Sequence, residues 1–189
     1  TTSAVNIAAF LAVTEIPTLL IDMDPQANST TGVGVQIGSY KNSIYDVLIG
    51  RSSIKDSIQK TDLEYLDIVP SSAELVAAEI ELVGMFSREM MLKDALEAIR
   101  GKYKFIIIDS PPSLGLLTVN VLTASNSIII PIQCEYYALE GLSQLLNSIR
   151  LVQKRLNKNL DIEGILVTMY DNRLNLSKNV VEELKGHFT

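Results

Sequence analysis

The sequence has a single cysteine, a single histidine and no tryptophan, and these absences exclude several classes of protein. One cysteine cannot build an internal disulfide framework, which is typical of proteins from a reducing cytoplasm. One histidine and one cysteine also leave no set of His and Cys ligands for a metal. No apolar run reaches the ~20 residues that a membrane-spanning helix needs. We therefore expect a cytoplasmic protein without a membrane span.

Positive charge is also in short supply. The chain has 16 Lys and Arg against 22 Asp and Glu, a formal net charge of -6. This balance excludes a generally basic DNA clamp, so any DNA contact needs a local patch, dimerisation or sequence outside this chain. Arg150, Lys154 and Lys158 share one face of a predicted helix. A solvated face is the favoured interpretation of this stripe, and contact with phosphates is the alternative.

What is present is an alternation of short apolar runs and helical patterns in 189 residues, of which 47% are hydrophobic. Strands are predicted at 18–21, 66–69, 104–108, 127–132 and 162–168. Helices are predicted at 3–13, 43–49, 73–83, 87–101, 115–124, 138–157 and 178–187, with Ser72, Ser87 and Ser177 as expected N-caps. Strands that are apolar on both faces indicate an α/β fold with a mostly parallel sheet covered by helices on both faces. We expect one domain over residues 1–189.

Three carboxylates follow two of these predicted strands. Asp22 and Asp24 come after the run at 18–21, and Asp109 ends the run FIIID. Because parallel sheets bind ligands at the carboxyl ends of their strands, we expect the three acids to converge there. Converging carboxylates need a cation, and Mg²⁺ with a phosphate ester is the usual partner. The alternative is that each acid caps a loop or helix.

Phosphoacceptor receiver domains also place acids after strands around Mg²⁺. Here Asp24 and Asp109 are 85 positions apart (24 to 109), which is too far for a domain of that size. No lysine ends a later strand either. The spacing therefore disfavours a receiver domain.

Four blocks carry a resemblance to a known family. They are LLIDMDPQANSTTGVG (19–34), FIIIDSPPSLGLLTVNVLTAS (105–125), IIIPIQCEYYALEGLSQL (128–145) and GILVTMYDNRLNLS (164–177). In this order, over essentially the whole chain, they resemble the ParA/Soj partition ATPases. These belong to the deviant-Walker P-loop class, which also contains MinD. The run DMDPQANST is similar to the ParA branch of that class.

The resemblance implies a P-loop NTPase fold that binds ATP and Mg²⁺, with a role for each matching residue. Asp24 would orient or activate the water that attacks the γ-phosphate. Thr1 would ligate Mg²⁺ directly, and Thr2 would lie near the phosphates. Asp22 and Asp109, the latter as the Walker B acid, would act on the Mg²⁺ shell through water.

The resemblance also implies segments that respond to the nucleotide. Residues 25–34 and 109–113 would be switch-like segments that sense the γ-phosphate. Candidates for the dimer interface or the nucleotide side are Glu135, Tyr136, Tyr137, Asp171 and Arg173.

For function, the resemblance implies a partition protein whose ATP-driven sandwich dimer binds DNA nonspecifically on the nucleoid. A ParB-like centromere-binding partner would stimulate hydrolysis and release it. The alternatives are a MinD-like or other cargo-positioning ATPase, or a non-hydrolysing scaffold.

The family signature KGGVGKT leads into the helix that begins TTSAVN, so the chain starts at the last residue of the signature. We therefore expect a fragment without the phosphate-binding loop, the first strand and the C-terminal end. The strand at 105–108 would then have unpaired backbone groups. We also expect the 189 residues alone to bind ATP weakly or not at all.

Overall fold

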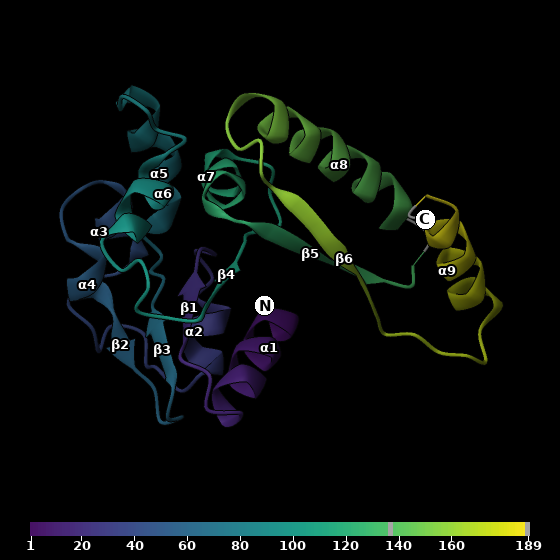
Figure 1. Cartoon of the computed structure of the whole chain (residues 1–189), viewed down its shortest axis with the longest axis horizontal. Coiled ribbons are helices and arrows are strands. Elements are labelled where there is room, and N and C mark those ends of the chain that lie inside the picture. The colour runs from purple at the N-terminus through teal and green to yellow at the C-terminus, as the bar shows by residue number, and fades with distance from the viewer. Residues whose placement is uncertain (136–137, 188–189) are drawn as a thin grey trace. The chain divides into compact units, whose positions relative to one another are not determined.

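The computed structural model describes residues 1–135 and 138–187. The chain divides into two compact units, Thr1–Ala124 and Ser125–Thr189, and each has its own sheet (Figure 1). The single domain expected over residues 1–189 stays a prediction. Within the described ranges, no helix is both long and apolar enough to cross a membrane.

The first unit is built on a four-stranded sheet with the order β2-β3-β1-β4. β3 (Leu66–Val69), β1 (Thr18–Asp22) and β4 (Phe105–Asp109) are parallel, and β2 (Gln59–Lys60) pairs antiparallel with β3. The three parallel strands were predicted from the sequence and are confirmed. β4 is the terminal strand of this sheet, as expected for the run at 105–108.

One face of this sheet packs on α1 (Thr2–Val13). Leu20 and Ile68, from neighbouring strands, share a buried cluster with Ala8 and Ala12 of the helix. The small alanine side chains let the helix approach the strands closely. Residues that alternate with Leu20 along β1 cannot reach this cluster, because successive side chains of a strand point to opposite faces.

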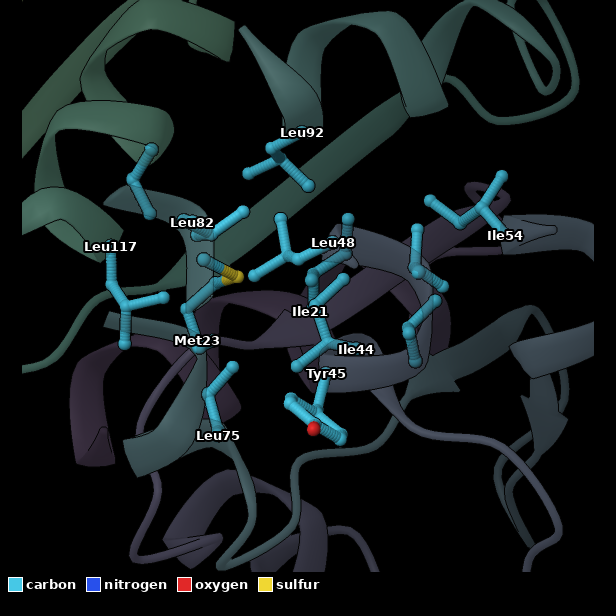
Figure 2. Close-up of a cluster of buried hydrophobic side chains, with 14 of the residues drawn as sticks. Ile21, Met23, Ile44, Tyr45, Leu48, Ile54, Leu75, Leu82, Leu92 and Leu117 are labelled. Atoms are coloured by element: carbon cyan, nitrogen blue, oxygen red, sulfur yellow. The ribbon is translucent and has the colours of Figure 1, made fainter. Parts of the chain in front are cut away.

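The opposite face holds the larger core (Figure 2). Leu19 and Ile21 of β1 enter it, and Leu75, Leu92 and Leu117 come from helices that cover this face. Leu75, Leu92 and Leu117 lie in α5 (Leu75–Glu81), α6 (Met91–Glu97) and α7 (Leu116–Ala124), and α3 (Ile44–Leu48) covers the same face. The α/β fold with helices on both faces of a mostly parallel sheet is thus confirmed.

Several short elements were not predicted, and three predicted caps were wrong. The unpredicted elements are α2 (Asn28–Gly32), α4 (Ile54–Ser57), β2 and the 3₁₀ turn η1 (Leu82–Gly84). The N-cap of α5 is Glu74, whose side chain accepts a hydrogen bond from Ser72. Ser87 has a positive φ of 53° and precedes the N-cap of α6, Met90. Ser177 lies inside α9 (Asn175–His187).

The second unit is a β-α-β arrangement followed by a helix. β5 (Ser127–Gln133) leads through α8 (Ala138–Arg155) to β6 (Asp161–Thr168), which pairs parallel with β5. The register shifts between Ile128 and Ile129, opposite Ile162 and Gly164. α9 then ends the described part of the chain (Figure 1).

Candidate functional site

The ends of β1 and β4 bring two acids together. Asp22 and Asp109 are direct partners in the parallel ladder, where neighbouring strands lie ~4.8 Å apart. Their residues are 0% and 4% exposed. Asp24 lies two positions beyond β1 and is half-buried. Over residues 1–135 and 138–187, no three His, Cys, Asp or Glu side chains form a metal-binding group. Of the three acids expected to converge, Asp22 and Asp109 therefore form a pair, and Asp24 does not complete a three-residue metal-binding group with them.

Asp22 is held by neutral donors. The backbone N–H and the hydroxyl of Thr30 each donate to Asp22 Oδ2 over 2.7 Å, and the N–H of Asp24 donates to Oδ1 over 3.1 Å. Burial raises the pKa of Asp22, the nearby charge of Asp109 acts in the same direction, and the hydrogen bonds from Thr30 and Asp24 oppose them. Burial outweighs the hydrogen bonds, so a cation at this place would be favourable.

Asp109 has its own set of contacts. The hydroxyl of Ser29 donates to Oδ2 over 2.7 Å, and the backbone nitrogen of Thr1 lies 2.9 Å from Oδ1. The N–H of Met23 donates to the carbonyl oxygen of Asp109 over 2.9 Å. Two predicted site residues, Thr1 and Asp109, are thus adjacent. Thr2 begins α1 with an exposed side chain.

Ser29 and Thr30 were missed by sequence reasoning. Both are fully buried in α2, a helix of five residues within the polar segment that was interpreted as a loop. Its N-cap, Ala27, has left-handed backbone angles of φ 53° and ψ 33°. Such a short helix has no apolar periodicity to reveal it. The available signal was the position of two hydroxyls shortly after the DMD run.

A second contact of Thr30 joins this site to the end of β3. The N–H of Ser71 donates to Thr30 Oγ1 over 3.0 Å, and the hydroxyl of Tyr40 donates to the carbonyl oxygen of Ser71. Ser71 Oγ is buried without a hydrogen-bond partner among the described residues. Burial, and next the charge of Asp22, raise the pKa of Tyr40. These hydrogen bonds connect the ends of β1 and β3, and α2 also contacts the end of β4 through Ser29 and Asp109.

Asp24 is held more loosely than Asp22. The hydrogen bond that its carboxylate accepts comes from the N–H of Gln26, over 2.9 Å, in a local turn. No long-range contact to another strand fixes this side chain in the described part of the chain. Asp24 is therefore freer than Asp22 to adjust to a ligand.

The remaining predicted residues belong to the second unit. Asp171 and Arg173 form an ion pair of 2.6 Å, and hydrogen bonds from Arg173 lower the pKa of Asp171. Glu135 is exposed just beyond β5. Their interface or nucleotide-side role stays a prediction. Tyr136 and Tyr137 lie outside the described residues.

A parallel sheet with helices on both faces and buried acids at its strand ends is the arrangement of α/β proteins that bind ligands at the carboxyl ends of their strands. The similarity to solved structures places the chain in the P-loop NTPase class of this arrangement. A family model described as an AAA domain matches residues 1–162. The chain is 54% identical over 188 residues to the sporulation initiation inhibitor protein Soj of Bacillus subtilis, covering all of this chain and 74% of that protein. It is 50% identical to the chromosome partitioning protein ParA of Myxococcus xanthus, covering all of this chain and 66% of the relative. The chain belongs to the ParA/Soj family of partition ATPases.

Solved structures agree with this fold. The crystal structure of cobyrinic acid a,c-diamide synthase from Mycobacterium smegmatis with bound ADP and magnesium matches with a TM-score of 0.93 and 36% identity. The match covers 99% of this chain and 76% of that one. This similarity extends over both units of the chain.

Proposed function

We propose that this protein is an ATP-hydrolysing, Mg²⁺-dependent partition protein that acts in the cytoplasm on the nucleoid. The observation that carries the proposal is the buried pair Asp22–Asp109 at the carboxyl ends of neighbouring strands. Two buried carboxylates this close are costly unless a cation lies near them. Membership of the ParA/Soj family, and the ADP and magnesium in the structure from M. smegmatis, support ATP and Mg²⁺ as the ligands.

The chemistry of the acid pair suits Mg²⁺. This ion prefers six oxygen ligands, keeps several of its waters and uses one or two carboxylates together with phosphates. Thr1, beside Asp109, would supply a direct hydroxyl ligand, and Asp22 and Asp109 would hold the waters of the ion. When bound, the ion neutralises charge that develops on the phosphates.

Asp24 is the proposed catalytic residue. Asp22 and Asp109 are fixed by buried hydroxyls, whereas Asp24 is half-buried and bonded to a neighbouring backbone N–H. An acid with this freedom can orient the water that attacks the γ-phosphate.

Replacing this acid tests the proposal. In the full-length protein, Asp24→Ala should keep ATP binding and slow turnover about 100-fold or more, the scale of a lost general base. Binding of a fluorescent ATP analogue and release of phosphate measure the two quantities. Asp94→Ala, at an exposed position of α6, is the matched control. Normal turnover by Asp24→Ala would remove Asp24 from the catalytic role.

We further propose that ATP drives formation of a sandwich dimer that binds DNA nonspecifically, and that a ParB-like centromere-binding partner stimulates hydrolysis to release it. Arg150, Lys154 and Lys158 are exposed along and just beyond α8 and are the candidate phosphate contacts. Size-exclusion chromatography of Asp24→Ala with and without ATP tests the dimer. DNA binding at several salt concentrations tests the contact, because phosphate contacts weaken steeply as salt rises.

The choice between an ATPase and a non-hydrolysing scaffold depends on the residues that precede Thr1 in the full-length protein. A glycine-rich KGGxGK run there would supply the backbone N–H groups and the lysine that bind the phosphates. Sequencing the gene upstream of the Thr1 codon decides the question. A start codon directly before Thr1 would favour the scaffold.

A further inference from the structure

Two neighbouring hydroxyls of α2 each hold one acid of the buried pair. Ser29 Oγ donates to Asp109 Oδ2, and Thr30 Oγ1 donates to Asp22 Oδ2, both over 2.7 Å. All four side chains are nearly or fully buried. Adjacent residues of a helix point about 100° apart, which lets two consecutive side chains reach two different strands.

We propose that the hydroxyls of Ser29 and Thr30 hold Asp109 and Asp22 in the orientation that binds the metal. Because Thr30 also contacts Ser71, it couples the orientation of Asp22 to the position of the segment that follows β3. The inference rests on the proposed Mg²⁺-dependent function and adds two positioning residues to it. In this proposal the two hydroxyls act through the carboxylates and do not themselves contact the metal or the phosphates.

The geometry of each carboxylate supports this role. A carboxylate has about four lone-pair sites, and a donor on one oxygen fixes which way the other faces. In both acids the α2 hydroxyl takes Oδ2. The contact to Oδ1 of Asp22 is the longer bond of 3.1 Å from the N–H of Asp24. Oδ1 of Asp109 lies 2.9 Å from the nitrogen of Thr1. Each Oδ1 therefore has one such contact and keeps a second lone pair that can accept from a water of the metal.

The hydroxyl of Thr30 acts as donor and acceptor at once. It donates to Asp22 and accepts from the N–H of Ser71. The carbonyl oxygen of Ser71 in turn accepts from Tyr40, so the segment after α2 is fastened to the same point. A valine has the shape of threonine but can do neither, and it would leave the N–H of Ser71 buried without a partner.

Thr30→Val and Thr30→Ser form the test pair in the full-length protein. Thr30→Val removes the hydroxyl and keeps the shape, whereas Thr30→Ser keeps the hydroxyl. Changes at residues that orient metal ligands typically cost 10- to 100-fold in metal affinity or activity, so Thr30→Val should raise the Mg²⁺ concentration for half-maximal ATP hydrolysis about tenfold or more. Thr30→Ser, which keeps the hydroxyl, should need a Mg²⁺ concentration close to that of the wild-type protein.

A second readout uses the protein without metal and nucleotide. Amide hydrogen exchange over residues 22–32 and at Ser71 should accelerate on the order of tenfold in Thr30→Val and stay near the wild-type rate in Thr30→Ser. This measurement needs no activity. If the wild-type protein does not hydrolyse ATP, the proposed function fails, and hydrogen exchange still decides whether Thr30 positions Asp22.

Two results would overturn the inference. One is an unchanged Mg²⁺ requirement and unchanged exchange in Thr30→Val. The other is impairment of Thr30→Ser as large as that of Thr30→Val, because Thr30→Ser keeps the hydroxyl and loses only the methyl group, so loss of the hydroxyl would not explain the effect. Should Thr30→Val fail to fold, Ser29→Ala and Ser29→Thr replace it, with the same expected contrast at Asp109. Equal behaviour of that second pair would also reject the role of the hydroxyls.

Discussion

Two buried acids of the same sheet, Asp67 and Asp22, differ in the charge of the groups that surround them. Asp67, near the amino ends of the parallel strands, is 5% exposed and lies 2.9 Å from Lys60 Nζ, its partner across β2 and β3. It also accepts a hydrogen bond of 2.7 Å from the hydroxyl of Tyr103. Asp22, at the carboxyl end of β1, has neutral donors and a second acid, Asp109, for a neighbour. An acid that has its own cation stabilises the fold, whereas an acid that has neutral donors and lies beside a second acid is suited to an external cation.

The largest expected effect separates the two acids by activity. Asp109→Asn should reduce ATP hydrolysis of the full-length protein about 100-fold, because it removes a charge that would hold the waters of Mg²⁺. Asp67→Asn, the same chemical change at the other end of the sheet, should leave the specific activity of folded protein within a small factor of wild type. Phosphate release under saturating ATP measures both. Equal losses in the two variants would break the distinction between a ligand-binding acid and a structural one.

The second-largest effect is on stability, and here the loss is expected in the variant of Asp67. Asp67→Asn leaves Lys60 without its carboxylate and weakens the contact to Tyr103, so the free energy of unfolding should fall by about 1–3 kcal/mol. The lower part of this range is favoured because the side chain of Lys60 is 86% exposed and its charge remains hydrated. Urea denaturation followed by circular dichroism provides the measurement. An unchanged midpoint would contradict the structural role of Asp67.

The smallest effect concerns the pH dependence of the same cluster. Burial raises the pKa of Tyr103 above its ordinary value of 10.0, and the hydrogen bond to Asp67 adds to the rise. The unfolded chain would therefore lose this proton at a lower pH than the folded protein. The stability linked to it is fully present below pH 10 and is lost as pH rises through the folded pKa. Tyr103→Phe should flatten the alkaline decline in melting temperature. A decline as steep as that of the wild type would assign it to other groups.

The strand-end acids could be predicted because a strand leaves a strong local signal. The runs before Asp22 and Asp109 are apolar and end abruptly in acid, and the rule that parallel strands bind ligands at their carboxyl ends then places both acids at one edge. The pairing of these residues in the ladder agrees with that expectation. Their separation of 87 positions (22 to 109) does not affect this placement, because the parallel direction of the strands alone puts both acids at that edge.

The supporting residues left no such signal. Serine and threonine are common in polar segments, and what distinguishes Ser29 and Thr30 is burial against strands that are distant in sequence. Asp67 was likewise overlooked inside LDIV, since Tyr103, 36 positions later, provides its hydroxyl partner. The helix caps failed for a related reason. Ser87 adopts a positive φ, and the local Ser pattern could not reveal that α6 begins after Met90.

The pairing of β1 with β4 has a consequence for how the site is assembled. Ile106 and Ile108 face the large core while Ile107 faces α1, so a slip of β4 by one residue would send every one of these side chains to the wrong face. The same slip would replace Asp109 by a neighbour opposite Asp22. Packing of the two apolar cores therefore favours the strand register that places Asp22 opposite Asp109. A chain with the strands out of step cannot present the acid pair, and metal binding would report correct strand alignment.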